Sequence, residues 1–151
     1  SCRPTFRRGV CEGAAERARV LIIDSDVLVW YLRGNAKAKT AVESQVPFSI
    51  SVITHMELIQ GMKSKEELRQ FQKRLGAWNI DIILIDREIS ARALFYVQEY
   101  CLSHSMMLSD ALIAATAVQS GEKLLTANDK HYKFIPNIEC VKFRPSARGK
   151  A

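Results

Sequence analysis

From residue 20 onward, short apolar runs alternate with longer segments in which apolar residues recur at helical spacing. The first run, residues 20–23, is apolar throughout, which is typical of a strand buried on both faces of a parallel sheet. Similar runs, each bounded by polar or turn-forming residues, follow it along the chain. Together they predict five strands, at about residues 20–23, 48–53, 80–85, 123–126 and 138–143.

The segments between these runs carry helix start and stop signals. We expect helices from a cap at Ser25 or Asp26 to Gly34, over 36–45, from a Thr54–Glu57 capping box to Gly61, from Ser64 to Leu75 before Gly76, after an Asp86 cap, and from a Ser109 cap to Gly121. Strands that alternate with helices in this way predict an α/β fold, a three-layer sandwich with a central parallel sheet.

The length of 151 residues fits one domain, and the basic excess lies at its two ends. Residues 1–19 carry five arginines and two glutamates, and residues 141–151 carry four basic groups and no acid. We therefore predict a poorly ordered basic extension over 1–19 outside the fold, a domain over 20–143, and a basic tail over 144–151. Such ends attract polyanions, including nucleic acids, but they also suit ordinary solubilising tails.

Two features bear on the compartment. No run approaches the roughly 18 uncharged apolar residues of a membrane span, and the charged first segment has no apolar core of a signal peptide. The four cysteines form no Cys-x-x-Cys pair, and Cys101 and Cys140 lie in apolar patterns where buried free thiols are common. We expect a cytoplasmic protein without a membrane partner.

Acidic residues stand where the hydrophobic pattern changes from one element to the next. Asp24 ends the first strand, Glu57 follows the second by a few residues, and Asp110 opens an apolar helix. Asn128 and Asp129 follow the fourth strand. Because the carboxyl ends of parallel strands meet at one edge of the sheet, these groups can converge there. Buried carboxylates are costly unless they are paired or bound to metal, so the convergence predicts a cation site.

Each of these acids also has a structural interpretation. Asp24 and Asp26 suit a helix cap, the Thr54 capping box accounts for Glu57, and Asp110 suits the positive end of a helix dipole. Asp129 resembles an ordinary exposed loop acid. Thr126 and Asn128 are candidates for hydrogen bonds to the fourth carboxylate, Asp129, or to a phosphate. His55, His104 and His131 lack the spacing of zinc ligands, and we expect them to be surface or packing residues.

Four segments together resemble a known family. They are LIIDSDVLVWYLRG at 21–34, SVITHMELIQG at 51–61, LSDALIAATA at 108–117 and LLTANDKHY at 124–132. In this order they are similar to the motifs of PIN-domain ribonucleases, specifically the VapC-type toxins of type II toxin–antitoxin systems. The resemblance spans about residues 20–143.

The resemblance implies an endoribonuclease that cleaves RNA with a divalent metal, Mg²⁺ or in its place Mn²⁺. It makes Asp24, Glu57 and Asp110 the catalytic, metal-binding carboxylates, with Asp129 as a fourth metal ligand. Asp26, Thr126 and Asn128 would support that site or contact the phosphate. The fourth motif departs from the acid-rich pattern, because Asn128 and His131 stand where relatives often have Asp.

The resemblance also implies a cognate antitoxin that restrains the nuclease. Apolar side chains on two predicted helices exceed what a small core can easily bury, so we expect some of them to form a groove for an amphipathic antitoxin segment or a face of a homodimer. These residues are Val29, Trp30, Leu32, Leu58, Ile59 and Met62. The alternative is that all six belong to the core.

Three other functions remain open at this point. Asp24-Ser25-Asp26-Val27 after an apolar strand also fits a haloacid-dehalogenase-type phosphatase, with Asp24 as nucleophile and Asp26 as general acid, although its later acidic motif is missing. A receiver domain would need a phosphoacceptor at the end of the third strand, where Asp86 is a weak candidate. A non-catalytic RNA-binding module would need metals to offset the carboxylates.

Overall fold

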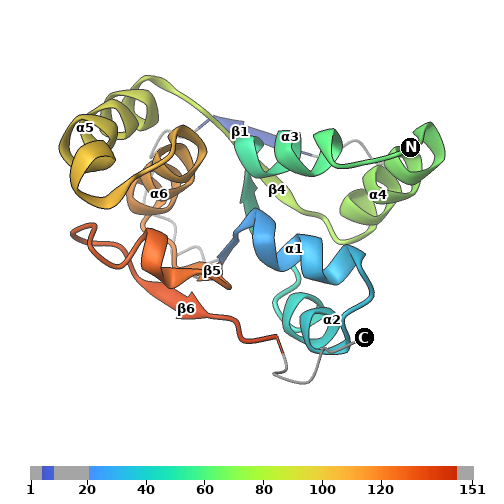
Figure 1. Cartoon of the computed structure of the whole chain (residues 1–151). Helices are drawn as coiled ribbons and strands as arrows, with labels where there is room; N and C mark the ends of the chain where they lie inside the picture. Colours follow the sequence, from blue (N-terminus) through green and yellow to red (C-terminus); the bar gives the residue numbers. More distant parts are fainter. Residues whose placement is uncertain (1–4, 9–20, 146–151) are drawn as a thin grey trace.

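The computed structural model describes residues 5–8 and 21–145 (Figure 1). All strand pairs are parallel, and the six strands form one sheet in the order β1-β4-β3-β2-β5-β6. The strands are β1 Thr5–Arg8, β2 Ile22–Ile23, β3 Ser49–Ser51, β4 Asp81–Leu84, β5 Leu124–Thr126 and β6 Cys140–Lys142. The five strands expected after residue 20 are all present, so the predicted α/β fold is confirmed.

Helices cover both faces of the sheet. They are α1 Ser25–Leu32, α2 Ala36–Glu43, α3 Val52–Gln60, α4 Lys65–Ala77, α5 Arg87–His104 and α6 Leu108–Ser120, and a 3₁₀ turn, η1, spans Asp129–His131. Figure 1 shows α5 and α6 together on one side of the strands and α1 to α4 on the other. The molecule is therefore the three-layer sandwich that the sequence predicts.

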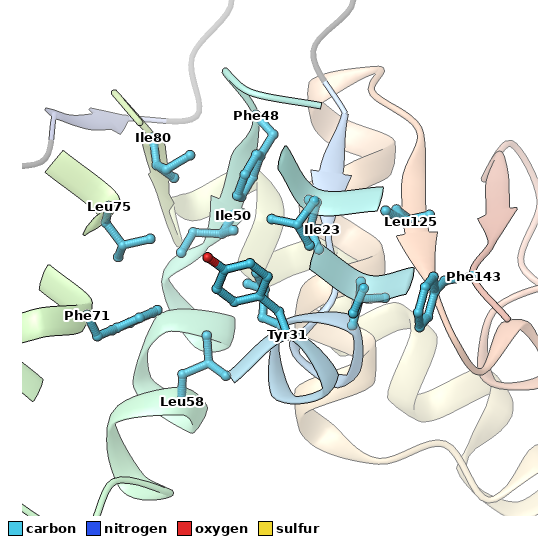
Figure 2. Close-up of a cluster of buried hydrophobic side chains, with 14 of the residues drawn as sticks. Ile23, Tyr31, Phe48, Ile50, Leu58, Phe71, Leu75, Ile80, Leu125 and Phe143 are labelled. Carbon is cyan, nitrogen blue, oxygen red and sulfur yellow. The ribbon is translucent and has the colours of Figure 1, made fainter. Parts of the chain in front are cut away.

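Successive strand residues face opposite hydrophobic cores. Ile23 and Leu125 belong to the core under α1 to α4, which Figure 2 shows with Tyr31, Leu58 and Phe71 from the helices. Their neighbours Ile22 and Leu124 belong to the second core, under α5 and α6. Because strand side chains alternate between faces, a strand covered on both sides buries every position, and most of these positions are apolar. Full burial of each such apolar side chain contributes roughly 1.5–3 kcal/mol. Strand β3 differs, since Ser49 and Ser51 are buried on either side of Ile50.

The N-terminal expectation differs from the structure at one segment. Thr5–Arg8, which we placed in an extension outside the fold, forms β1 and pairs in parallel with β4, from Thr5 opposite Asp81 to Arg8 opposite Leu84. An edge strand is held by backbone hydrogen bonds, so it needs no hydrophobic period that a sequence reading could detect. The other residues of 1–19 lie outside the described residues, as do 146–151 of the expected tail.

Three helix starts also differ from expectation. The expected cap of α1 at Ser25 or Asp26 is wrong, because Asp24 is the cap and its carboxylate accepts from the Ser25 N–H. The structural interpretation of Asp24 as a helix cap is thereby confirmed. Helix α3 begins at Val52 behind a Ser51 cap, so strand β3 ends at Ser51 and the Thr54 capping box does not form. Helix α6 begins at Leu108, before the predicted Ser109 cap, and its start has no side-chain cap.

Other boundary signals are confirmed. Ser64 caps α4 and accepts from the Glu67 N–H at 3.1 Å, and Asp86 caps α5 and accepts from the Ile89 N–H at 2.8 Å. Gly121 ends α6 with φ of +65°, a left-handed conformation that glycine adopts without steric cost. Gly76 does not end α4, which continues to Ala77.

Within the described part of the chain, no helix is both long enough and apolar enough to cross a membrane. The expectation of buried thiols is wrong for Cys101, which is exposed on α5, whereas Cys140 is half-buried. A residue in an amphipathic helix is buried only if it lies on the apolar face, and Cys101 lies on the outer one. Cys2 and Cys11 lie outside the described residues.

Candidate functional site

Strand register brings the first and fourth motifs together. In the parallel pairing of β2 with β5, Ile23 lies opposite Leu125, and the Asp24 N–H donates to the Leu125 carbonyl at 2.9 Å. Asp24 and Thr126 therefore leave the sheet side by side at its carboxyl edge. The Thr126 hydroxyl donates to Asp24 Oδ2 at 3.0 Å.

Asp24 is buried and receives four hydrogen bonds. Its Oδ1 accepts from the Ser25 N–H at 2.7 Å and from the Ser25 hydroxyl at 3.3 Å. Its Oδ2 accepts from Thr126 and, at 2.9 Å, from the hydroxyl of Tyr132. The side chain is nevertheless without a cationic partner in the described structure, and the residue is 5% exposed. Burial, and then the charge of Asp26, raise the pKa of Asp24 to about 7.

Asp26 lies beside Asp24 and is fixed to the segment after β5. The Ala127 N–H donates to both of its oxygens, at 3.2 and 3.1 Å, and the Thr126 hydroxyl lies 3.3 Å from its Oδ2. Thr126 thus lies between two carboxylates while it accepts from the Asn128 N–H at 3.1 Å. Burial raises the pKa of Asp26 despite these hydrogen bonds. Asp26 and Thr126 contact or orient Asp24, and Asn128 reaches it through Thr126.

Asp110, in the first turn of α6, joins the same cluster from the other face of the sheet. Its Oδ1 lies 3.3 Å from the Tyr132 hydroxyl, which also binds Asp24. Its Oδ2 lies 3.1 Å from Nδ1 of His131. One tyrosine hydroxyl therefore links two of the three carboxylates predicted to act together.

Glu57 completes the cluster from the second turn of α3. Because α3 begins at Val52, Glu57 is too far along the helix to cap it, and the structural interpretation based on Thr54 is wrong. Burial, followed by the charges of Asp110 and Asp26, raises the pKa of Glu57, while a hydrogen bond from Ser25 lowers it. Its Oε1 is buried, and no described residue donates a hydrogen bond to it.

Asp129 differs from the other three acids. It begins the η1 turn, and its Oδ1 pairs with Nζ of Lys142 on β6 at 3.0 Å. This contact with Lys142 is the main reason that the pKa of Asp129 is lowered. Its role as a fourth ligand remains a prediction.

A metal cage is not preformed in the described residues, where no three His, Cys, Asp or Glu side chains are grouped closely enough to hold an ion. The geometry gives a reason, because the Tyr132 hydroxyl and the other donors already take up the lone pairs of Asp24. Ligation would require the carboxylates to exchange some of these donors for the cation.

The contacts of two residues in this cluster were not predicted from the sequence. His131 is a surface residue as expected, with a side chain that is 49% exposed, but its contact with Asp110 was not predicted. Tyr132 was not singled out, yet it is 1% exposed and its hydroxyl lies at the centre of the cluster. The available signal was their place at the end of the fourth motif, in the turn that follows β5.

The apolar set proposed as a partner groove divides between core and surface. Leu58 is buried and belongs to the core. Val29, Trp30 and Met62 pack against that core and remain partly accessible, and Leu32 is exposed. The core therefore buries only part of the apolar set on α1 and α3. The remaining residues form a half-buried apolar surface there.

Comparisons with known proteins agree with this architecture. Ribonuclease VapC10 of Mycobacterium tuberculosis is 32% identical over 124 residues, which is 80% of this chain and 91% of that protein. A chain in a toxin–antitoxin complex from Klebsiella pneumoniae is 31% identical with a TM-score of 0.64, covering 83% of this chain and 98% of that one. In fold alone, VapBC2 from Rickettsia felis, solved with a promoter DNA fragment, is also similar, with a TM-score of 0.67 at 20% identity over 83% of this chain and 99% of that one.

A family model for the PIN domain matches residues 21–135, which include Asp24, Glu57, Asp110 and the turn that carries Tyr132. This match covers well over half of the sequence and coincides with the sheet and the helices that build the acidic cluster. The chain belongs to the PIN domain family.

Proposed function

We propose that this protein is a metal-dependent endoribonuclease and the toxin of a toxin–antitoxin pair. The observation that carries the proposal is the meeting of Asp24, Asp110 and Glu57 at the carboxyl edge of a PIN-family sheet. The 32% identity to a ribonuclease over most of the chain supports the reaction class. We further propose Mg²⁺ as the physiological ion, with Mn²⁺ as a substitute.

The chemistry of these side chains fits a hard divalent cation. Carboxylate oxygens are the preferred ligands of Mg²⁺ and Mn²⁺, and in the described part of the chain Asp24 and Asp110 form no ion pair with a lysine or arginine. The buried Oε1 of Glu57, to which no described group donates, is an acceptor that a cation would satisfy. Asp24, Asp110 and Glu57 would hold the ion, and Asp129 is the weakest candidate because Lys142 already neutralises it.

A bound divalent ion would lower the pKa of a coordinated water and offset the negative charge of the scissile phosphate. The chain's own contribution is to hold acceptors in place at this edge of the sheet. Ser25 and Thr126 fix the Asp24 carboxylate, and Ala127 fixes Asp26 beside it. The side chains of Asn128 and Lys130, next to this edge, are candidates for contacts with the RNA backbone.

The phosphatase alternative requires Asp24 to attack phosphorus directly. An attacking carboxylate needs a free, accessible oxygen, and both oxygens of Asp24 are hydrogen-bonded within a residue that is 5% exposed. Membership of the PIN domain family also argues against the phosphatase and the receiver domain. A nucleophilic water is therefore the better supported route.

The antitoxin is proposed to bind the partly accessible apolar surface of α1 and α3. A solved relative at 31% identity is a toxin–antitoxin complex, which supports a protein partner of this kind. A homodimer also stays in the proposal. The face first expected for it is the same apolar surface of α1 and α3. Other large apolar side chains are exposed on α5 and at the start of α6, namely Leu94, Phe95, Leu102, Met107 and Leu108.

The direct test is cleavage of an RNA pool by the purified protein with Mg²⁺, with EDTA, and with Mg²⁺ restored in excess after EDTA. We expect cleavage in the first and third reactions and none in the second, with 5′-phosphate ends on the products. Undiminished cleavage in EDTA would contradict the metal-dependent mechanism. Formation of an aspartyl-phosphate from a phosphomonoester would favour the phosphatase instead.

A further inference from the structure

The turn after β5 holds both oxygens of Asp110. His131 ends η1 and places Nδ1 3.1 Å from Asp110 Oδ2. The next residue, Tyr132, places its hydroxyl 3.3 Å from Oδ1 of the same carboxylate. Two consecutive residues of one turn thus contact one carboxylate on a separate helix, α6.

The second ring nitrogen of His131, Nε2, also has a hydrogen-bond partner. The chemistry of that partner indicates which ring nitrogen bears the proton. His131 Nε2 lies 3.0 Å from the side-chain nitrogen of Asn128. An amide NH₂ can only donate, so Nε2 accepts and Nδ1 carries the hydrogen that points to Asp110. The three side chains form a chain of hydrogen bonds from Asn128 through the imidazole to the carboxylate.

Tyr132 supports this arrangement from the buried side. Its ring is 1% exposed, so its hydroxyl cannot move far from Asp24 and Asp110. Burial and the charges of Asp24 and Asp110 raise the pKa of Tyr132, so the phenol remains a donor. Both residues contact the Asp110 carboxylate, His131 from the solvent-exposed side and Tyr132 from the buried side.

The start of α6 shows that this geometry is not simple helix capping. The first turn of α6 has no side-chain cap, and an acid in a first turn ordinarily interacts with the backbone N–H groups there. Both oxygens of Asp110 instead contact His131 and Tyr132. The carboxylate is therefore turned away from its own helix and toward Asp24.

We propose that His131 is a positioning residue, which holds the Asp110 carboxylate in the orientation needed for metal ligation. This inference rests on the proposed function, because it assigns His131 a role toward a carboxylate of the proposed metal site. His131 occupies a place where an acidic group was expected, and it orients a neighbouring ligand by hydrogen bonding. Groups that hold ligands in this way typically change metal affinity about 10–100-fold when they are removed.

The test compares Mn²⁺ binding to the metal-free protein by calorimetry for His131→Ala and His131→Asn. An asparagine amide nitrogen lies near the place of Nδ1 and can restore the hydrogen bond to Asp110, whereas alanine cannot. We expect the alanine variant to bind Mn²⁺ about 10-fold more weakly and the asparagine variant to stay within about 3-fold of the wild type. In RNA cleavage, kcat should fall for alanine with KM for RNA little changed.

Two further variants complete the design. His104→Ala is the matched control, because His104 is an exposed histidine that contacts Ser103 and Phe134. It should bind Mn²⁺ like the wild type. Asp110→Asn tests the proposed metal site itself and should lose most Mn²⁺ affinity.

The outcomes separate the two hypotheses. Wild-type Mn²⁺ binding by His131→Ala, with affinity lost in Asp110→Asn, would overturn the positioning role and leave the metal site in place. Equal losses in the alanine and asparagine variants would also overturn it, because they would indicate that the imidazole itself binds the ion. Unchanged binding in Asp110→Asn would instead contradict the proposed function.

Discussion

Asp24 and Asp129 both follow a buried parallel strand at the same edge of the sheet, yet their surroundings are opposite. Asp24 is buried, accepts four hydrogen bonds from neutral donors and has a raised pKa. Asp129 has a side chain that is 27% exposed, pairs with Lys142 and has a lowered pKa. Position at the carboxyl edge therefore does not by itself make an acid a metal ligand. An acid whose charge is not yet balanced by a cation is the better candidate.

The largest expected difference between the two acids is in RNA cleavage. Asp24→Asn or Asp110→Asn should lower the rate at least ~10²-fold with the fold retained, because each removes a charged ligand of the proposed ion, which would supply several kcal/mol to catalysis. Asp129→Asn should change the rate far less. Cleavage rates under single-turnover conditions, with circular dichroism as the control for folding, measure this. A larger loss in Asp129→Asn than in Asp24→Asn would reverse the assignment of ligands.

The second expected difference is in how the stability of the metal-free protein depends on pH. The pKa of Asp24 is raised from 3.8 to about 7, so the folded state favours the protonated carboxyl. The stability gained from protonation is complete below pH 3.8 and is lost as the pH rises through about 7. Between about pH 5.5 and about pH 8, the wild type in EDTA should lose about 2 kcal/mol of unfolding free energy relative to Asp24→Asn.

Urea unfolding at the two pH values measures this loss of unfolding free energy. Saturating Mn²⁺ should make the loss smaller, because a cation stabilises the charged carboxylate. Asp129→Asn is the matched control and should follow the wild type. The pKa of Asp129 is lowered, so its carboxylate does not change charge in this pH range. Parallel pH profiles for the wild type and Asp24→Asn would show that Asp24 is ionised throughout.

A smaller effect is expected from the Tyr132 hydroxyl. Tyr132→Phe removes one donor from Asp24 and preserves the buried ring, while Thr126 still donates to the same oxygen. We expect a loss of about 1.5 kcal/mol in metal-free unfolding near pH 8, the lower end for hydrogen bonds to charged groups. Tyr100→Phe is the control, because Tyr100 packs its ring on Phe134 away from the carboxylates. Equal stability of the two variants would mean that the hydroxyl contributes nothing to the cluster.

The smallest effect should follow from removing the partner of Asp129. Lys142→Gln breaks an exposed ion pair, and such pairs contribute little to stability. We expect the midpoint of urea unfolding and the affinity for Mn²⁺ to stay at wild-type values. Tighter Mn²⁺ binding in this variant would show that Lys142 masks a true fourth ligand, and Asp129 would then join the site.

Much of the fold follows from the sequence because the strands are buried on both faces. The apolar pairs Ile22–Ile23 and Leu124–Leu125 indicate strands without any knowledge of their neighbours. The same reading placed Asp24 and the residues after the fourth strand, Asn128 and Asp129, at one edge. It failed for β1, which is held by backbone pairing, and for the start of α3, where the Ser51 hydroxyl supplies the cap ahead of Thr54.

The contacts of His131 and Tyr132 could not be read from local pattern. Tyr132 reaches Asp24 across 108 positions of sequence and Asp110 across 22. Whether two such groups meet depends on how α6 and the turn after β5 pack on the sheet. An aromatic residue after a turn equally predicts simple burial, and the hydroxyl gains its role only from the carboxylates that the fold brings to it.

Strand β2 is two residues long, and this has a genetic consequence. Ile22 faces one core, Ile23 faces the other, and Asp24 follows directly. A cavity made in either core therefore lies next to the carboxylate, with no intervening residue to absorb the shift. In a selection for cells that survive expression of this chain, we expect conditional, heat-sensitive alleles at Ile22 and Ile23 alongside null alleles at Asp24. A single peptide bond therefore separates Ile23, a core residue, from Asp24, a proposed metal ligand.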